Sequence, residues 1–424
     1  MDSLQPQMSD IGVIGLVPDQ WQAPWMPRHH VMSRLAKYFR VAWLNPRLSP
    51  RDKLDAARLH SSGLEQPQGM QVIQPGCMLA HLGRYDFLRR MLQRQRLKGA
   101  ARLLSTTGCR RIILYVWRPE FEPALDMISH DLSCYHIDDE YTFADQEQPM
   151  SEVEARLLAR VNQVFIHSPG LMAKKGGINP NTQYVSNGVD YPAYSFSAPE
   201  PDDLAKVPRP RIGYVGYIKR QLDLDLLLAL ARKHSNWSYV LVGPVNESRL
   251  SQEELSVLDS LKKMTNVYFL GGKTVPELPA YVQHMDVCLL PYRVNDYTKF
   301  IYPLKLHEYL ATGRPVVGSM IRTLKEYADV VRLAADTDDW SDAITDALRP
   351  AANAPALVAH RRSVASKYDW NLLVAEIAHT LCLRLGSEYA ERFEKLRLDF
   401  DSRVHVKSLG ASGQSCKLSM RQKV

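Results

Sequence analysis

Short apolar runs alternate with helical patterns along the first half of the chain. Ile11–Val17 is such a run, a helical pattern starts near His29, and Val41–Leu44 is the next run. Similar apolar runs follow at Arg111–Val116, Leu132–Ile137, Gln163–Ile166 and Tyr184–Val185. Because strands that alternate with helices form parallel sheets covered on both faces, residues 1–195 are expected to be a doubly wound α/β domain.

A proline-rich stretch separates this series from a second one. Five prolines occur from Pro192 to Pro210, a composition typical of a linker, which we place at residues 196–210. Strand and helix patterns then alternate again from Arg211 to Tyr327. Residues 211–370 are therefore predicted to form a second Rossmann-like domain, in keeping with a chain of 424 residues.

The end of the chain has a different pattern. A long helical pattern covers Asn371–Leu398 with a break near Gly386, so residues 371–403 are expected to form C-terminal helices. Residues 404–424 are polar and basic, and they are predicted to be disordered.

The composition is that of a soluble globular protein, with 45% hydrophobic and 23% charged residues. No apolar run approaches the roughly 20 residues that span a bilayer, and the N-terminus lacks the pattern of a secretory signal. The six cysteines are scattered without a CxxC pair, which favours reduced thiols over disulfides or a zinc site. We therefore expect a cytoplasmic protein.

Positive charge is concentrated between Arg84 and Arg111, although the net charge of the chain is only +7. Leucines and methionines recur among the cations at helical spacing, which predicts a basic amphipathic helix. Such a helix can lie on the anionic inner face of a membrane. Alternatively, its apolar side packs on the domain and its cations only face water. Nucleic acid is not an expected partner, because no known reader motif accompanies the cations.

The segment Tyr297–Gly318 contains the clearest candidate chemistry. Pro303 suits the first position of a helix, and Gly313 suits the residue just past its end. Lys305 lies in the first turn, where a helix already favours anions, and Glu308 projects from the same face. A cation for a diphosphate beside a carboxylate for ribose hydroxyls is what a nucleotide-sugar site requires. The alternative is a solvent-exposed Lys–Glu pair on a surface helix.

The same segment also follows a longer pattern, P-x-K-x-x-E-Y-x-A-x-G-x-P-V-V. The residues that meet it are Pro303, Lys305, Glu308, Tyr309, Ala311, Gly313, Pro315, Val316 and Val317. This resembles the donor motif of family-four-like glycosyltransferases, most closely the bacterial branch that builds extracellular polysaccharides. Three further segments are similar to family elements in the same order, namely Asn187–Asp190, Gly213–Gly216 and Leu289–Tyr292.

The resemblance implies a GT-B fold, in which two Rossmann-like domains face each other across a cleft and a C-terminal helix crosses back to the first domain. It implies that Glu308 binds the donor ribose, and that Lys305 and a second cation hold the diphosphate and stabilise its charge as it departs. The implied donor site comprises Gly216, Lys219, Arg220, Lys305, Leu306 and Glu308. The implied reaction transfers a sugar from a nucleotide-diphosphate donor to a glycan or lipid-linked glycan, with retention of anomeric configuration.

The chain departs from the family pattern in two places. After the second-domain glycine, relatives carry Arg and Lys where this chain has Tyr217 and Leu222. Lys219 and Arg220 are the candidate substitutes.

In the other place, many relatives carry a first glutamate eight residues before the second one, where this chain has Phe300. Asn295 and Thr298 lie just upstream and are candidates for the sugar contacts instead. A non-catalytic glycan-binding subunit is therefore an alternative function, and a GT-B epimerase or phosphorylase would use the same phosphate site.

Acidic residues follow the predicted strand Leu132–Ile137, at the sheet edge where ligands of open α/β sheets bind. Asp138 or Asp139 is a candidate to orient or deprotonate an acceptor hydroxyl, and the alternative is a polar turn that caps the next helix. Arg28 and His29, at the start of the first helix, are candidate acceptor or phosphate contacts. Alternatively, they only complete the N-terminal turn of that helix.

No metal or other cofactor is expected besides the nucleotide-sugar substrate. Asp223-x-Asp225 and Asp336-x-Asp338 match the D-x-D pattern of metal-dependent glycosyltransferases of another fold. Each pair opens a predicted helix, where acids interact favourably with the helix dipole.

Overall fold

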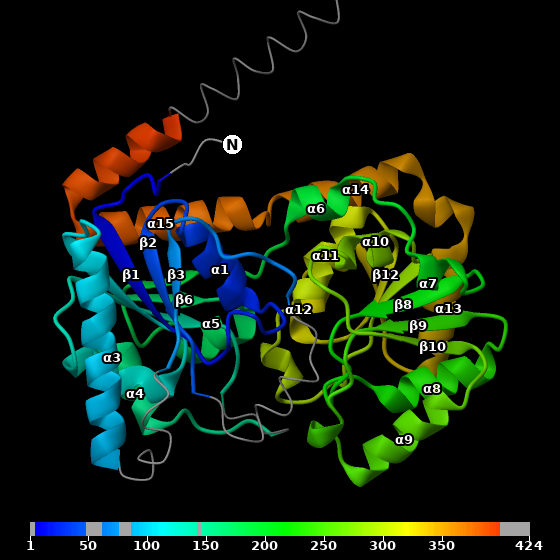
Figure 1. Cartoon of the computed structure of the whole chain (residues 1–424). Helices are drawn as coiled ribbons and strands as arrows, with labels where there is room; N and C mark the ends of the chain where they lie inside the picture. The colour runs from blue at the N-terminus through cyan, green and yellow to red at the C-terminus, as the bar shows by residue number, and fades with distance from the viewer. Residues whose placement is uncertain (1–4, 48–61, 76–85, 142–145, 399–424) are drawn as a thin grey trace, which may run out of the picture.

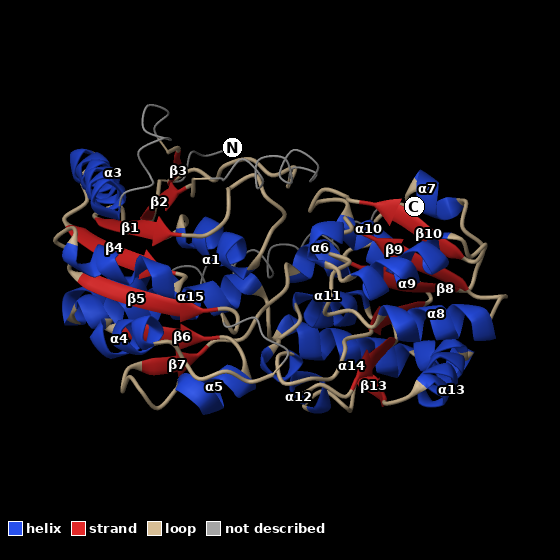
Figure 2. Cartoon of the chain, turned by 90° about the horizontal axis from the view of Figure 1, so that it is seen from below, coloured by secondary structure: helices blue, strands red, loops and turns tan. Residues whose placement is uncertain are grey.

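The computed structural model describes residues 5–47, 62–75, 86–141 and 146–398. In it two α/β domains lie side by side, each with a sheet at its centre and helices on both faces (Figures 1 and 2). Arg84 and the predicted tail, residues 404–424, lie outside the described residues.

The first domain is built on a seven-stranded parallel sheet in the order β3-β2-β1-β4-β5-β6-β7. Its strands are β1 (Ile11–Leu16), β2 (Arg40–Leu44), β3 (Met70–Ile73), β4 (Arg111–Val116), β5 (Leu132–Ile137), β6 (Gln163–Ile166) and β7 (Thr182–Tyr184). Its helices are α1 (Pro27–Leu35), α3 (Asp86–Thr106), η2 (Pro119–Asp126), α4 (Glu152–Arg160) and α5 (Pro169–Lys175). Both faces of the sheet are buried, one in each of two apolar clusters, which explains the continuous apolar runs of its strands.

The second domain has a six-stranded parallel sheet in the order β10-β9-β8-β11-β12-β13. Its strands are β8 (Arg211–Val215), β9 (Ser238–Val242), β10 (Val267–Gly271), β11 (Val287–Leu290), β12 (Val316–Ser319) and β13 (Val331–Ala334). Its helices are α6 (Tyr191–Ser195), α7 (Asp202–Ala205), α8 (Leu224–Lys233), η3 (Glu247–Arg249), α9 (Gln252–Lys262), α10 (Leu278–Gln283), η4 (Thr298–Phe300), α11 (Leu304–Thr312), α12 (Arg322–Lys325), α13 (Thr337–Leu348), η5 (Pro350–Asn353) and α14 (Pro355–Ser366). Helix α6 precedes the predicted linker but packs on this domain (Figure 1), because Tyr194 belongs to its apolar core.

The order of the strands fixes where a ligand can bind. In each sheet the chain reverses direction of winding beside the strand that opens the domain, between β1 and β4 and between β8 and β11. Ligands of such sheets bind outside the carboxyl ends of the strands at this point. Asp138 after β5, Gly216 after β8 and Gly243 after β9 line one cavity, so both sheets direct their carboxyl ends to the same space.

The C-terminal helix α15 (Trp370–Leu385) crosses back to the first domain, as predicted. Figure 1 shows α14 over the second domain and α15 over the first. The apolar side of α15, including Trp370 and Ile377, belongs to a first-domain cluster, and the Trp370 ring stacks on His30 of α1 with 5.2 Å between centroids. The predicted break is confirmed, because Gly386 has a φ of 132° and residues 387–398 are helical beyond it.

The basic helix of the first domain is α3, on the side away from the second domain (Figures 1 and 2). Leu97, Ala100 and Leu104 are buried in a first-domain cluster, while most of its cations are exposed. Arg96 is the exception among them, since it donates hydrogen bonds to the carbonyl oxygens of Asn45 and Ile73. No helix within the described ranges is both long enough and apolar enough to cross a bilayer.

The aspartates of the two D-x-D patterns begin helices, as predicted. The Asp223 carboxylate accepts a hydrogen bond of 3.0 Å from the Leu226 N–H at the start of α8. Asp336 accepts bonds from the N–H groups of Asp338 and Asp339 at the start of α13. Their spacing thus has a structural cause in helix capping.

Candidate functional site

A cavity of about 490 Å³ lies between the two domains. Helix α11, the turns after the β-strands and the start of α1 all contribute to its wall. Of the residues predicted from the sequence, the wall includes Asp138, Asp139, Gly216, Lys219, Lys305 and Glu308.

The N-terminus of α11 points its first residues at this cavity. The helix begins at Leu304 with Pro303 as its N-cap, one residue later than predicted, and Gly313 ends it with a φ of 78°. No side chain caps the N-terminus, and no acidic residue lies in its first turn. Pro303, Leu304 and Lys305 line the cavity, so the free N–H groups and the positive end of the helix dipole favour an anion there.

Lys305 lies against the turn that follows β8. A Cβ on Gly216 would overlap Cε and Nζ of Lys305, and Gly216 has a φ of 146°, so this position requires glycine. Tyr309 holds the same turn from the next turn of α11, because its hydroxyl accepts a hydrogen bond of 2.8 Å from the Val215 N–H. Gly216, Lys305 and Tyr309 of the predicted motifs therefore all take part in the contact between α11 and the turn after β8.

The charged groups that the second domain places at the cavity are Lys305, Glu308 and Lys219, which are half-buried and have shifted pKa values. Burial lowers the pKa of Lys305 to about 8, Glu308 opposes this shift and Lys219 reinforces it. Burial raises the pKa of Glu308, against the effects of Lys305 and a hydrogen bond with Tyr194. Burial also lowers the pKa of Lys219, which Asp139 opposes. The alternative of a solvent-exposed Lys–Glu pair is thus wrong, and perturbed groups gathered in one cavity indicate a functional site.

Asp138 and Asp139 both line the cavity, but their surroundings differ. Asp138 is buried and accepts hydrogen bonds from Arg28 and from the Tyr141 hydroxyl. Burial raises its pKa, but several groups led by Arg28 outweigh burial, and the net shift is downward. Burial raises the pKa of Asp139, whose Oδ1 accepts a hydrogen bond of 2.9 Å from the Tyr297 hydroxyl of the second domain. Asp139 is therefore the better proton acceptor of the two.

Arg28 and His29, the candidate acceptor contacts, do not line the cavity. Arg28 is buried and pairs with Asp19 and Asp138. His29 is fully buried, its Nδ1 accepts from the Met26 N–H, and its Nε2 contacts the Gln20 carbonyl oxygen. Burial lowers the pKa of His29 to about 4. Both side chains complete the start of α1, and Arg28 supports Asp138 from behind.

Four second-domain candidates also lie outside the cavity wall. Leu306 is fully buried in the domain core, and Arg220 is exposed on the turn that carries Lys219. The side chains of Asn295 and Thr298 each accept a hydrogen bond from the other residue's N–H, at 2.9 and 3.0 Å, which closes a turn before η4. None of these four residues lines the cavity, and of the two candidate cations on the turn after β8 only Lys219 does.

Sequence reasoning missed several polar residues of the wall, among them His167, Asn187, Tyr194 and Tyr297. His167 directly follows β6, so the rule that singled out Asp138 after β5 would also have found it. Its Nδ1 donates to the Ile137 carbonyl oxygen at 2.9 Å, which orients the ring. Asn187 donates to the Tyr302 carbonyl oxygen across the domain boundary at 2.7 Å.

Comparison with known proteins agrees with this geometry. Residues 209–350 match the family described as glycosyl transferases group 1. The second domain is therefore similar to the domain that this family describes. The teichuronic acid biosynthesis glycosyltransferase TuaH of Bacillus subtilis (strain 168) is 30% identical over 199 residues, which are 46% of this chain and 49% of TuaH. The chain thus spans about half the length of this curated relative.

Solved structures share the fold of most of this chain. Sucrose-phosphate synthase from Thermosynechococcus elongatus is 15% identical with a TM-score of 0.67, and the match covers 87% of this chain and 97% of that one. Anabaena HepE in complex with UDP and glucose is 16% identical with a TM-score of 0.63, covering 88% and 99%. The second domain, which matches the group 1 family, is thus half of a GT-B fold, and the predicted resemblance to GT-B enzymes of bacterial polysaccharide biosynthesis is confirmed.

Proposed function

We propose that the protein is a glycosyltransferase that moves a sugar from a nucleotide-diphosphate donor to a glycan or lipid-linked glycan. The observation that carries the proposal is that Lys305 and Glu308 of one helix share a cavity with Asp139 of the opposite domain. The cation at the helix N-terminus suits a diphosphate, and the carboxylate suits ribose hydroxyls. Asp139 faces them from the other side, where it would orient an acceptor hydroxyl or take its proton.

Lys305 and Lys219 would stabilise the negative charge that develops on the departing diphosphate. Retention of configuration and independence from metal ions are part of the same proposal. The name of TuaH refers to the biosynthesis of teichuronic acid, which supports a polysaccharide acceptor. Because a structure of the same fold contains UDP and glucose, UDP-glucose is the first donor to test.

The experiment begins with thermal unfolding of the purified protein in the presence of UDP-, GDP-, ADP- and dTDP-sugars. A ligand present at one hundred times its Kd stabilises the folded state by about 2.7 kcal/mol, so the true donor raises Tm. Transfer of the sugar from that donor is then followed by mass spectrometry with glycan and lipid-linked acceptors. Lys305→Ala and Glu308→Ala should both abolish product, and full activity of either variant would exclude the donor site.

The same measurement separates the alternatives. An epimerase would change the sugar of the nucleotide without an acceptor, and a phosphorylase would require inorganic phosphate. A glycan-binding subunit would bind the acceptor and release no nucleotide diphosphate. Phe300, which suggested that last alternative, lies buried against the first domain and not in the cavity wall.

We further propose that α3 holds the protein on an anionic membrane surface. Arg94, Lys98 and Arg102 line an open groove on the exposed side of α3, and near its start Phe87 is 76% exposed. Each cation near such a surface contributes about 1 kcal/mol, so replacing all three by Gln should weaken binding to anionic vesicles about a hundredfold at low salt. Replacing Arg232, Lys233 and Lys262 of the second domain is the matched control. Equal sedimentation of both variants with the vesicles would refute the proposal.

A further inference from the structure

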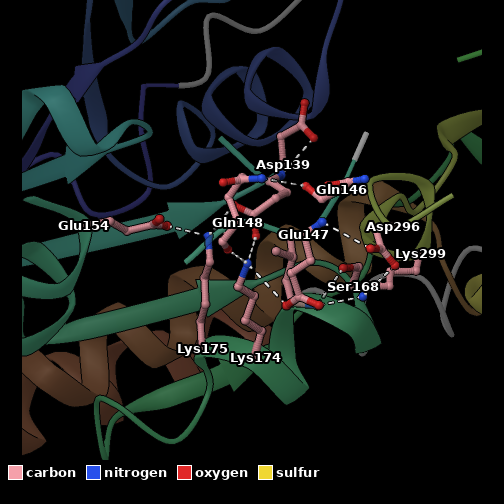
Figure 3. Close-up of polar contacts among 12 residues, drawn as sticks. Asp139, Gln146, Glu147, Gln148, Glu154, Ser168, Lys174, Lys175, Asp296 and Lys299 are labelled. Atoms are coloured by element: carbon pink, nitrogen blue, oxygen red, sulfur yellow. Dashed lines mark hydrogen bonds and ion pairs between the residues drawn. The ribbon is translucent and has the colours of Figure 1, made fainter. Parts of the chain in front are cut away.

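A short segment of the second domain, Asn295–Ile301, is fastened to the first domain (Figure 3). Lys299 donates to the Glu147 carboxylate at 2.6 Å, and the Glu147 N–H donates to Asp296 at 3.2 Å. Lys174 of α5 forms an ion pair with Glu147 at 3.5 Å, so charges of both domains meet at this carboxylate. Such partly exposed ion pairs contribute little energy singly, but they fix the position of the segment.

The buried part of the same contact is Phe300. This side chain is 4% exposed and belongs to a first-domain cluster that also contains Leu171. A Cβ on Gly170 of α5 would lie 2.6 Å from the Lys299 carbonyl oxygen, so glycine is needed for the two elements to approach this closely. The position where relatives carry a glutamate is thus used here to anchor one domain on the other.

The anchored segment brings Tyr297 to the cavity. Tyr297 lies three residues before Phe300, is buried, and donates its hydroxyl to Asp139 Oδ1 at 2.9 Å. This hydrogen bond joins the two domains inside the cavity wall. Any separation of the domains at this point would break it.

We propose that Tyr297 is a positioning residue, which reaches from the second domain to hold the Asp139 carboxylate in place for the acceptor while the domains are in contact. The proposal rests on the proposed function, because it takes Asp139 as the group that receives the acceptor hydroxyl. Tyr297 itself need not touch either substrate.

The charged and polar groups around Asp139 determine the sign of the effect. Lys219, the Tyr297 hydroxyl and His167 favour its ionised form, whereas burial and the neighbouring Asp138 disfavour it. Loss of the Tyr297 hydroxyl removes a donor that stabilises the carboxylate, so the pKa of Asp139 rises. As the pH is lowered, Asp139 of the variant should become protonated, and activity that requires its ionised form should be lost, at a higher pH than in the wild type.

The test compares pH profiles of kcat/KM for wild type and Tyr297→Phe. We expect the acidic limb of the variant to move upward by about one pH unit, with a smaller change on the plateau at higher pH. Lys299→Met is the matched control, because it removes ion pairs of the same segment without touching Asp139. Its acidic limb should stay where it is in the wild type. An unmoved limb in Tyr297→Phe, or an equal shift in Lys299→Met, overturns the proposal.

A second measurement needs no substrate. Titration of the Asp139 carboxyl by 13C NMR, with Asp139→Asn to assign the signal, should give a higher pKa in Tyr297→Phe than in the wild type. If this shift is present but no transfer occurs with any donor, the proposed function fails and the coupling across the domains stands. If transfer occurs but the pKa is unchanged, the coupling is wrong and the proposed function stands.

Discussion

Gly216→Ala tests the donor site through a residue that is not itself charged. The added Cβ would overlap Cε and Nζ of Lys305, which are the far end of a flexible side chain. We therefore expect the lysine to move and the backbone of the turn to stay, so that the ammonium leaves its place at the N-terminus of α11.

Two costs of this substitution can be separated. Alanine at a φ of 146° strains the backbone by about 1 kcal/mol, which affects folding only. Displacement of Lys305 removes a charge-assisted hydrogen bond to the diphosphate, worth about 1.5–3 kcal/mol. Donor affinity should therefore fall roughly ten- to a hundredfold.

Gly271→Ala is the matched control for the first cost. Gly271 ends β10 with a φ of 69°, and a Cβ there meets no described atom within 4 Å. Both variants should unfold at lower urea concentration than the wild type. Calorimetric titration with the donor found by thermal unfolding should show weaker binding for Gly216→Ala alone. Equal affinities of the two variants would refute the placement of the diphosphate beside Lys305.

Four further predictions concern charge and packing. Because the pKa of unliganded Lys305 is about 8, the donor Kd should rise up to about tenfold from pH 7 to pH 9, and Lys305→Met should remove this dependence in calorimetric titration. Because the pKa of Lys305 is lowered in the folded state, the unfolded chain binds more protons than the folded one between about pH 8 and 10.5. The contribution of Lys305 to the free energy of unfolding should therefore become more favourable as the pH rises through this window. Urea unfolding of the wild type and Lys305→Met across this pH range measures the effect. Glu308→Gln should weaken UDP-sugar binding at least tenfold and leave binding of inorganic diphosphate unchanged, whereas Glu326→Gln on the exposed surface should change neither. Phe300→Glu should lower the free energy of unfolding by about 2–4 kcal/mol without improving donor affinity. Phe300→Leu should lower the free energy of unfolding by less. Tighter donor binding by Phe300→Glu would contradict the buried position of Phe300.

The sequence predicts the central strands better than the edge strands. β4, β5, β6, β8 and β11 begin and end where their apolar runs do, because both faces of these strands are buried. β3 and β13 were not predicted. They lie at sheet edges, and Gln71 and Arg332 in them face solvent, so neither strand forms a continuous apolar run. α14 was also missed, since its apolar pattern is weak and only Arg361 and Ala365 are buried.

The candidate site likewise contains residues that the sequence could place and residues that it could not. Lys305, Glu308 and Gly216 could be predicted because helix spacing and a local turn place them, and local geometry follows from nearby sequence. Tyr297 and Phe300 could not be placed, because their roles depend on how two domains pack. The same holds for Arg28 and His29, whose partners are fixed by the loop before α1 and by β5. Nothing in the spacing of those residues shows which side of the helix start faces the cavity.

The two chain crossings between the domains meet at one point. Val189 on the outward crossing pairs with Tyr368 and Trp370 on the return, through two backbone hydrogen bonds of 2.9 Å. With both crossings tied together, a swing about this point is the motion that stretches the chain least. A protease cut at residues 196–201, between α6 and α7, would then leave two fragments that stay associated through α6 and α15. The two halves of such a nicked protein should co-purify and still close on a donor.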